Sequence, residues 1–201
     1  MFDAKIRPLI DPPLNRMGAA IARTGITANQ LTIAGAAVGV LSGAAIGAGR
    51  FDLGLALILI SRLLDGLDGA VARATRTTDF GGYLDIVADF IFYVSAPLGF
   101  GFADASNMPF ALALVASFTI TGVSFLSFAA IAAKRGLKTD AHGEKSFFYS
   151  TGLAEGTETI AVFVLMCLAP DWFAAIACIY AALCVVTVIQ RSFAARAAFR
   201  D

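Results

Sequence analysis

Residues 61–90 read SRLLDGLDGAVARATRTTDFGGYLDIVADF, and this stretch decides how the chain folds. It places Asp65 and Asp68 in one apolar segment and Asp85 and Asp89 in the next. An isolated carboxylate at the centre of a bilayer costs roughly 3 kcal/mol on insertion scales. If these segments cross a membrane, the four acids therefore need compensating positive charge.

The composition of the whole chain is that of a membrane protein. Of its 201 residues, 58% are hydrophobic and only 15% are charged, and the mean hydropathy is +0.78. Soluble domains carry about 25% charged residues, so this chain has too little charge to cover a water-facing surface. Fifteen Lys and Arg balance fifteen Asp and Glu. The zero net charge argues against nucleic acid as a partner, because nucleic-acid binders present a net basic face.

The apolar segments match the length of transmembrane helices, which need about 20 residues each. We predict an all-α integral membrane protein with six transmembrane helices, forming a single membrane domain over residues 1–201. The predicted spans are residues 29–49, 52–73, 80–103, 109–133, 150–169 and 172–194.

Residues 1–26 precede the six-helix bundle of residues 27–201. After Pro13, Leu14 and Met17 recur at helical spacing with Ile21, whereas Arg16 lies on another side. This pattern predicts an amphipathic helix in the membrane surface, ending before a glycine at position 25.

The basic residues predict the orientation. Thirteen of the fifteen Lys and Arg precede the first span or follow the second, fourth and sixth spans. The loops around residues 104–107 and 170–171 contain neither Lys nor Arg. By the positive-inside rule we expect both termini, and a pocket near Arg73, on the cytoplasmic side of a bacterial-type inner membrane.

Two further patterns predict packing rather than chemistry. Glycines recur at every fourth position of the first span, which lets a neighbouring helix approach closely. They are Gly35, Gly39, Gly43 and Gly47. The three cysteines lie in apolar stretches and are interpreted as buried small hydrophobic residues. They are Cys167, Cys178 and Cys184.

The spacing of the four aspartates predicts a metal site. Asp65 and Asp68 are three residues apart and Asp85 and Asp89 four apart, so each pair shares one helix face. The short connection makes the two helices antiparallel neighbours, so the carboxylates can converge. Oxygen ligands without His or Cys suit Mg²⁺ or Mn²⁺.

Other residues of the stretch favour phosphoryl transfer. Arg62 and Arg73 supply part of the missing positive charge, and the planar fork of Arg73 suits a phosphate. Gly69 and Gly81 leave room for a substrate against the backbone. In phosphoryl transfer, metal ions stabilise the attacking and leaving oxygens.

The same residues resemble the signature of the CDP-alcohol phosphotransferases, also called CDP-alcohol phosphatidyltransferases. That signature is D-x2-D-G-x2-A-R, then seven or eight residues, then G-x3-D-x3-D. Its positions are filled here by Asp65, Asp68, Gly69, Ala72, Arg73, Gly81, Asp85 and Asp89. The predicted layout of six spans after a surface helix is also similar to the family.

The resemblance implies an activity. Such enzymes attack the β-phosphorus of a CDP-linked alcohol, most often CDP-diacylglycerol, with an acceptor hydroxyl, and they release CMP in phospholipid biosynthesis. It implies a homodimer and a divalent cofactor, Mg²⁺ or Mn²⁺, as two ions.

The resemblance also implies roles for residues. Asp65, Asp68 and Asp85 would ligate metal, and Asp89 would border the metals and accept the proton of the acceptor. The CDP moiety would be held by Asp65, Gly69, Arg73 and Gly81.

Weaker candidates lie around this stretch. Many family members have Pro-Asn-x-x-Thr at the start of the first span, and here Ala28 replaces the proline. Asn29 either contacts the nucleotide or, like Thr27, caps the helix. Glu155 pairs with Arg62, shapes the acceptor pocket or sits at a dimer contact, and the same alternatives hold for Glu158 three residues on.

Lys145 either contacts a phosphate of the acceptor or only anchors a loop at the lipid headgroups. Two other functions also stay open. An ion-coupled transporter would spread its intramembrane acids along a pathway. A catalytically silent family member would serve as a membrane scaffold.

Overall fold

The computed structural model describes residues 3–136, 153–154 and 156–199. In this part of the chain every regular element is a helix, which confirms the all-α prediction. The helices are α1 (Asp3–Ala22), α2 (Ala28–Gly47), α3 (Phe51–Ala74), α4 (Asp79–Ala103), α5 (Met108–Lys134), α6 (Gly156–Leu168) and α7 (Phe173–Ala198), with the 3-10 helices η1 (Ala105–Asn107) and η2 (Pro170–Trp172).

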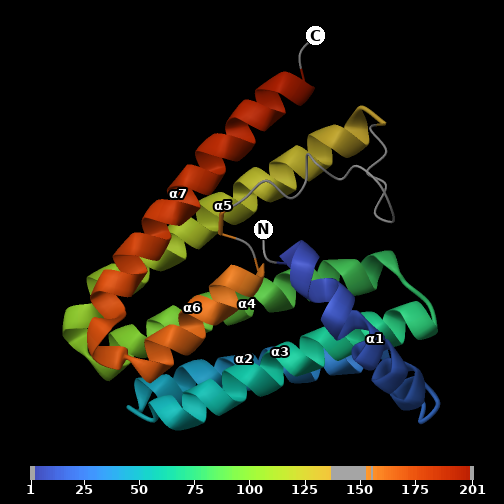
Figure 1. Cartoon of the computed structure of the whole chain (residues 1–201), viewed down its shortest axis with the longest axis horizontal. Helices are drawn as coiled ribbons and strands as arrows, with labels where there is room; N and C mark the ends of the chain where they lie inside the picture. Colours follow the sequence, from blue (N-terminus) through green and yellow to red (C-terminus); the bar gives the residue numbers. More distant parts are fainter. Residues whose placement is uncertain (1–2, 137–152, 155, 200–201) are drawn as a thin grey trace.

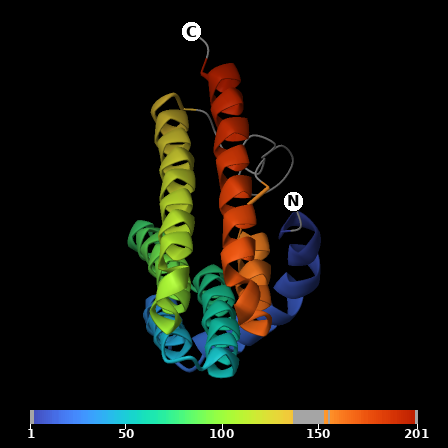
Figure 2. The same ribbon diagram turned by 90° about the vertical axis from the view of Figure 1, so that its left-hand side faces the viewer.

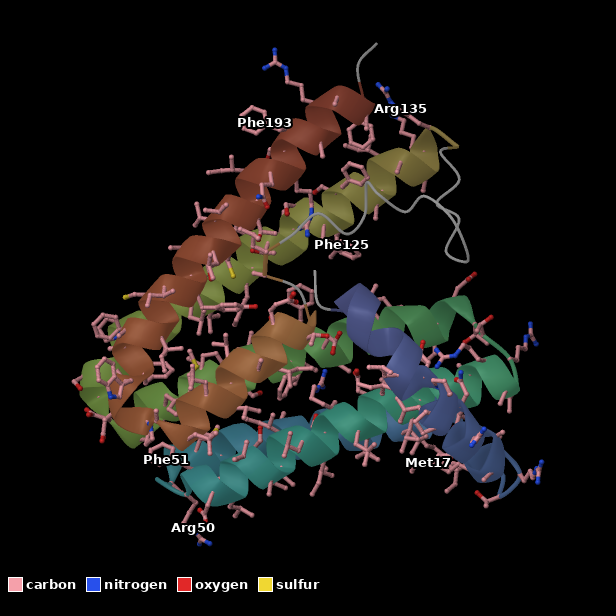
Figure 3. All side chains as sticks on the ribbon, viewed as in Figure 1. Met17, Arg50, Phe51, Phe125, Arg135 and Phe193 are labelled. Carbon is pink, nitrogen blue, oxygen red and sulfur yellow. The ribbon has the colours of Figure 1, made fainter. Side chains whose placement is uncertain are left out.

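From α2 to α7, successive helices run in alternating directions (Figure 1). α2, α3 and α4 form a closely packed body, α1 crosses α3, and α6 lies against α3. α5 and α7 run side by side and diverge from that body, as both views show (Figure 2). Arg50 and Phe51 lie at the start of α3, whereas Met17 of α1 lies towards the other end of α3 (Figure 3).

The glycines of α2 explain how closely the body packs. A Cβ on Gly39 would lie 3.2 Å from the ring of Phe92 on α4 and 3.2 Å from the Ser61 hydroxyl on α3. A Cβ on Gly43 would collide with the Ser95 carbonyl of α4. The glycine pattern therefore serves helix packing, as the sequence predicted.

α1 differs from the prediction in where it begins. The helix was expected after Pro13, but it runs from Asp3 through Pro12 and Pro13. The fixed φ of proline near −65° is itself helical, and the cost of proline lies mainly in a missing N–H donor and a steric clash. Here the carbonyls of Pro8 and Leu9 lose their helical N–H partners, yet the helix continues.

Four of the six predicted spans have the length and composition of membrane-crossing helices: α2, α4, α5 and α7, the last two extended by η1 and η2. α3 is also long, at 24 residues, but its acidic and basic residues lower its hydropathy. α6 has 13 described residues, and the start of the predicted span 150–169 lies outside the described residues. Six spans therefore remain a prediction, as does a membrane-surface position for α1.

Polar side chains define the helix starts next to the acidic stretch. Thr27 and Gln30 form a capping box at α2, so Thr27 is the cap and Asn29 lies inside the helix. Thr78 caps α4 by accepting from the Gly81 amide at 3.0 Å. Gly25, with φ of +85°, lies in the turn after α1, as predicted.

Aromatic rings fill the core between the body and the α5–α7 pair. Phe92 of α4 packs on Phe163 of α6, and Phe118 of α5 contacts Phe163 as well. Cys167 and Cys184 are buried there as predicted, but Cys178 is exposed. The prediction for Cys178 was wrong because an apolar helix in a membrane turns small residues towards lipid as well as inwards.

Candidate active site

Three of the four aspartates meet between α3 and α4. Asp65, Asp68 and Asp85 each offer a carboxylate oxygen, and these oxygens all lie within 4.8 Å of one another. Asp68 is buried, Asp65 is partly buried and Asp85 is exposed. α3 and α4 run antiparallel, but both pack against α2 rather than closely against each other, so the prediction that they are packed neighbours was wrong. Their carboxylates nevertheless converge as expected. The resulting group has only oxygen donors, which are the ligands that Mg²⁺ and Mn²⁺ prefer.

Asp68 is held in place by a residue of α2. The Thr32 hydroxyl lies 2.6 Å from Oδ2 of Asp68, and both side chains are buried, at 5% exposure. The same hydroxyl lies 3.1 Å from the Ala28 carbonyl, so its single proton is directed to the nearer carboxylate. Thr32 is the threonine of the Pro-Asn-x-x-Thr pattern, three positions after Asn29 on the same helix face, but the sequence assigned it no role.

Asp89 is not part of the group of three carboxylates. Its Oδ1 accepts a hydrogen bond of 2.6 Å from Nη1 of Arg62 on α3. The same Nη1 lies 3.4 Å from Oδ1 of Asp65. The structure therefore brings all four aspartates into one acidic cluster, but it pairs the fourth with an arginine.

Arg73 is oriented by α1. Its Nε and Nη2 donate to Oδ1 of Asn15 at 3.2 and 3.0 Å. Its Nη1 lies 3.2 Å from the position that a Cβ on Gly69 would occupy, so the glycine makes room for the guanidinium. Nothing in the sequence pattern indicated Asn15, because it lies on a different helix, 58 residues from its partner.

Gly81 and Asn29 are neighbours at the start of α4. A Cβ on Gly81 would lie 3.3 Å from Oδ1 of Asn29 and 3.0 Å from the Thr78 hydroxyl. Asn29 thus sits beside one signature residue, and α2 contributes two polar side chains to the region of the acidic cluster.

The remaining candidates fall elsewhere. Lys145 and Glu155 lie outside the described residues. Glu158 is in the first turn of α6, and its Oε2 is buried. Arg191 of α7, which was not among the candidates named above, donates from Nη1 to the Thr121 carbonyl at 2.9 Å and to the Ser124 hydroxyl at 2.7 Å, which connects α7 to α5.

Two relatives match the chain over different lengths. The inner membrane protein YnjF of Escherichia coli (strain K12) is 47% identical over 194 residues, which are 95% of this chain and 93% of that protein. The archaetidylinositol phosphate synthase of Pyrococcus horikoshii is 41% identical over 87 residues, which are 43% of this chain and 46% of that protein.

Solved structures share the fold. The phosphatidylinositol phosphate synthase PgsA1 of Mycobacterium tuberculosis with CDP-DAG bound has a TM-score of 0.66 and 21% identity, covering 91% of this chain and 93% of that one. Its complex with manganese and citrate has a TM-score of 0.65 and 23% identity, covering 90% and 88%.

The model of the CDP-alcohol phosphatidyltransferase family matches residues 25–190 of this chain. This range contains the whole acidic cluster and Arg73. Together with the full-length relative, this match confirms the resemblance seen in the signature. The chain belongs to the CDP-alcohol phosphatidyltransferase family, whose members are enzymes that transfer substituted phosphate groups.

Proposed function

We propose that this chain transfers the substituted phosphate of a CDP-linked lipid, with CDP-diacylglycerol as the expected donor, to the hydroxyl of an acceptor. CMP is the second product. The observation that carries the proposal is the group formed by Asp65, Asp68 and Asp85, whose oxygens lie within 4.8 Å of one another next to the family's arginine. Three carboxylates so close together, one of them buried, repel one another unless a cation joins them.

These residues fit a divalent cofactor, either Mg²⁺ or Mn²⁺. Asp65, Asp68 and Asp85 would hold the ion, with Thr32 fixing the carboxylate of Asp68. When bound, the ion would neutralise the diphosphate and the charge that develops on the leaving phosphate. The solved neighbour with manganese supports this choice of metal by its fold.

The nucleotide end of the donor would lie between Gly69, Gly81 and Arg73. Asn15 occupies the Nε and Nη2 edge of Arg73, so Nη1 is the donor left to bind a phosphate oxygen. A glycine at position 69 keeps the space beside Nη1 open. The CDP-DAG bound to the neighbour of similar fold supports a donor of this class.

Asp89 would act as the base. Arg62 engages its Oδ1, so the proton of the acceptor hydroxyl would pass to Oδ2. As the acceptor oxygen bonds to the β-phosphorus, the bond from that phosphorus to the bridging oxygen breaks. CMP then leaves with the electron pair of that bond.

The charge distribution and one relative support a proposal for the membrane in which the chain lies and for its orientation there. We place the chain in a bacterial inner membrane, in line with the name of its relative from Escherichia coli, with both termini and the site on the cytoplasmic side. We further propose that residues 1–201 form one membrane domain that works as a homodimer.

Release of CMP tests the proposed activity. The purified chain in lipid nanodiscs is given CDP-diacylglycerol, Mg²⁺ or Mn²⁺, and a panel of acceptors: inositol phosphate, glycerol-3-phosphate, serine and a second lipid. We expect CMP release with one acceptor and none without metal. Lipid analysis of cells that overproduce the chain would identify the new headgroup.

Asp85→Asn is the matched loss-of-function variant, and it should lower the rate by at least about a hundredfold because it removes a ligand from the metal. Asp79→Asn removes an acid from the first turn of the same helix and should leave the rate within about twofold, since Asp79 is exposed. No CMP release with any acceptor, or full activity in Asp85→Asn, would contradict the proposal.

A further inference from the structure

Tyr93 lies one helical turn after Asp89 on α4, so the two side chains share one face of that helix. Side chains on an α-helix lean towards its N-terminus, which directs the ring of Tyr93 back over the turn that carries Asp89. Of the charged groups, Asp89 has the strongest electrostatic interaction with the Tyr93 hydroxyl, ahead of Arg62. The hydroxyl is therefore a polar neighbour of the carboxylate that we propose as the base.

The ring of Tyr93 is held in place by other aromatic rings. Its centroid lies 6.2 Å from that of Phe90, 5.6 Å from that of Phe92 and 5.8 Å from that of Phe118. Phe118 belongs to α5, so these contacts come from two helices. Aromatic pairs at such distances attract one another in preferred orientations. The packing therefore keeps the hydroxyl of Tyr93 at one place relative to Asp89.

The hydroxyl at the end of this fixed ring borders open space. No residue in the described part of the chain forms a hydrogen bond with it, and it is not one of the fully buried polar atoms without a partner. A Cβ on Gly156, the first residue of α6, would lie 3.7 Å from the hydroxyl and would meet no other described residue outside its own turn within 4 Å. Gly156 is itself exposed. The space lies between α4 and the start of α6.

We propose that Tyr93 binds the acceptor. When the reacting hydroxyl of the acceptor lies at Oδ2 of Asp89, the hydroxyl of Tyr93 forms a hydrogen bond with a second hydroxyl of the same molecule, and Gly156 leaves the room for it. The acceptor that fits is an alcohol with two neighbouring hydroxyls, because an acceptor with only one would leave Tyr93 without a partner. The inference rests on the proposed function, since it requires Asp89 to be the base.

Two acceptors that differ by one hydroxyl test the proposal. They are glycerol-3-phosphate and 3-hydroxypropyl phosphate, which lacks the hydroxyl next to the reacting one. Release of CMP is measured for the chain in lipid nanodiscs with CDP-diacylglycerol and Mn²⁺. We expect the wild-type chain to prefer glycerol-3-phosphate by about tenfold or more in kcat/KM. Inositol phosphate and its deoxy analogue, which lacks a hydroxyl beside the reacting one, form a second pair with the same expected preference.

Three variants make the result specific. Tyr93→Phe keeps the ring contacts, so Tm should not change, whereas the KM for the acceptor with two hydroxyls should rise about three- to tenfold and the KM for CDP-diacylglycerol should stay the same. Tyr83→Phe makes the same change at an exposed position of α4 and should leave both KM values unchanged. Gly156→Ala adds a methyl group at ordinary contact distance from the Tyr93 hydroxyl, so it should fold normally and raise the KM for the acceptor.

The outcomes separate this inference from the proposed function. An unchanged KM in Tyr93→Phe, or a rise that is equally large for both members of a pair, would limit Tyr93 to packing and leave the activity standing. Transfer to serine alone among the acceptors would also overturn the inference, because serine has a single hydroxyl. A wild-type chain that releases no CMP with any acceptor would overturn the proposed function and this inference with it.

Discussion

At the scale of single residues, the hydroxyl of Thr32 is the clearest test of how the acidic cluster is held. Thr32→Val keeps the shape but removes the 2.6 Å hydrogen bond to Asp68. Removing such a supporting contact weakens metal binding by about 10–100-fold. We expect the Kd for Mn²⁺ to rise by that factor when the chain in lipid nanodiscs is titrated with Mn²⁺ and free Mn²⁺ is measured by electron paramagnetic resonance.

Thr119→Val is the matched control, because the Thr119 hydroxyl on α5 bonds only the Val115 carbonyl of its own helix in the structure described. Its Kd should equal that of the wild-type chain. A Thr32→Val chain with unchanged affinity for Mn²⁺ would show that metal binding does not depend on the hydrogen bond from Thr32 to Asp68.

Neighbouring glycines at the start of α4 offer a second test. A Cβ on Gly81 would press on Thr78 and Asn29 at 3.0 and 3.3 Å, whereas a Cβ on Gly82 meets no atom within 4 Å. We expect Gly81→Ala to raise the KM for the CDP-linked donor by about tenfold, through crowding of the proposed nucleotide end. Gly82→Ala should leave KM unchanged, and equal kinetics of the two variants would contradict the role given to Gly81.

Sequence reasoning found the residues of the site whose signal lies within one helix. A spacing of three residues places Asp65 and Asp68 on one face of α3, and the short connection to α4 predicts that Asp85 comes near them. The contacts of Asn15 and Thr32 were not predicted, because their partners lie 58 and 36 residues away and such contacts depend on packing between helices. The pairing of Arg62 with Asp89 was likewise not predicted, since it depends on the relative height of α3 and α4.

At the scale of elements, α1 should act as part of the site through its contact with α3. A Cβ on Gly18 would lie 2.6 Å from Cβ of Ala70 and 2.8 Å from the backbone of the same residue. Gly18→Leu therefore forces α1 away from α3, at a cost of about 1–3 kcal/mol for overpacking. We expect a lower Tm and, because Asn15 then releases Arg73, a higher KM for the donor.

The control is Ala20→Leu, which adds the same side chain at an exposed position of α1. Its Tm and KM should match those of the wild-type chain. A lower Tm with an unchanged KM in Gly18→Leu would limit α1 to a structural role.

The elements themselves were predictable to differing degrees. The lengths of the apolar segments predicted the bounds of α2, α4 and α5 to within a few residues, because each segment is long, continuous and bounded by polar residues or glycine. The start of α1 was missed because proline usually ends or kinks a helix, whereas this helix continues through Pro12 and Pro13. The outward direction of Cys178 was missed because an evenly apolar helix gives no sign of which face is buried.

At the scale of the whole molecule, the arrangement predicts which loops face each side of the membrane. Alternating helix directions put the α3–α4 connection at one end and η1 and η2 at the other (Figure 1). Arg76 lies in the first of these regions, whereas residues 104–107 carry no Lys or Arg. By the positive-inside rule we expect the α3–α4 connection and the acidic cluster near it to face the cytoplasm.

Labelling of single cysteines tests this orientation, in a chain whose Cys167, Cys178 and Cys184 have been replaced by alanine. A membrane-impermeant maleimide should label Ser106→Cys in intact cells, because Ser106 is exposed in η1. It should label Thr77→Cys only after the membrane is permeabilised, since Thr77 is exposed between α3 and α4. The opposite pattern would place the acidic cluster outside the cell, away from cytoplasmic nucleotides, and would contradict a CDP-linked donor as well as the orientation.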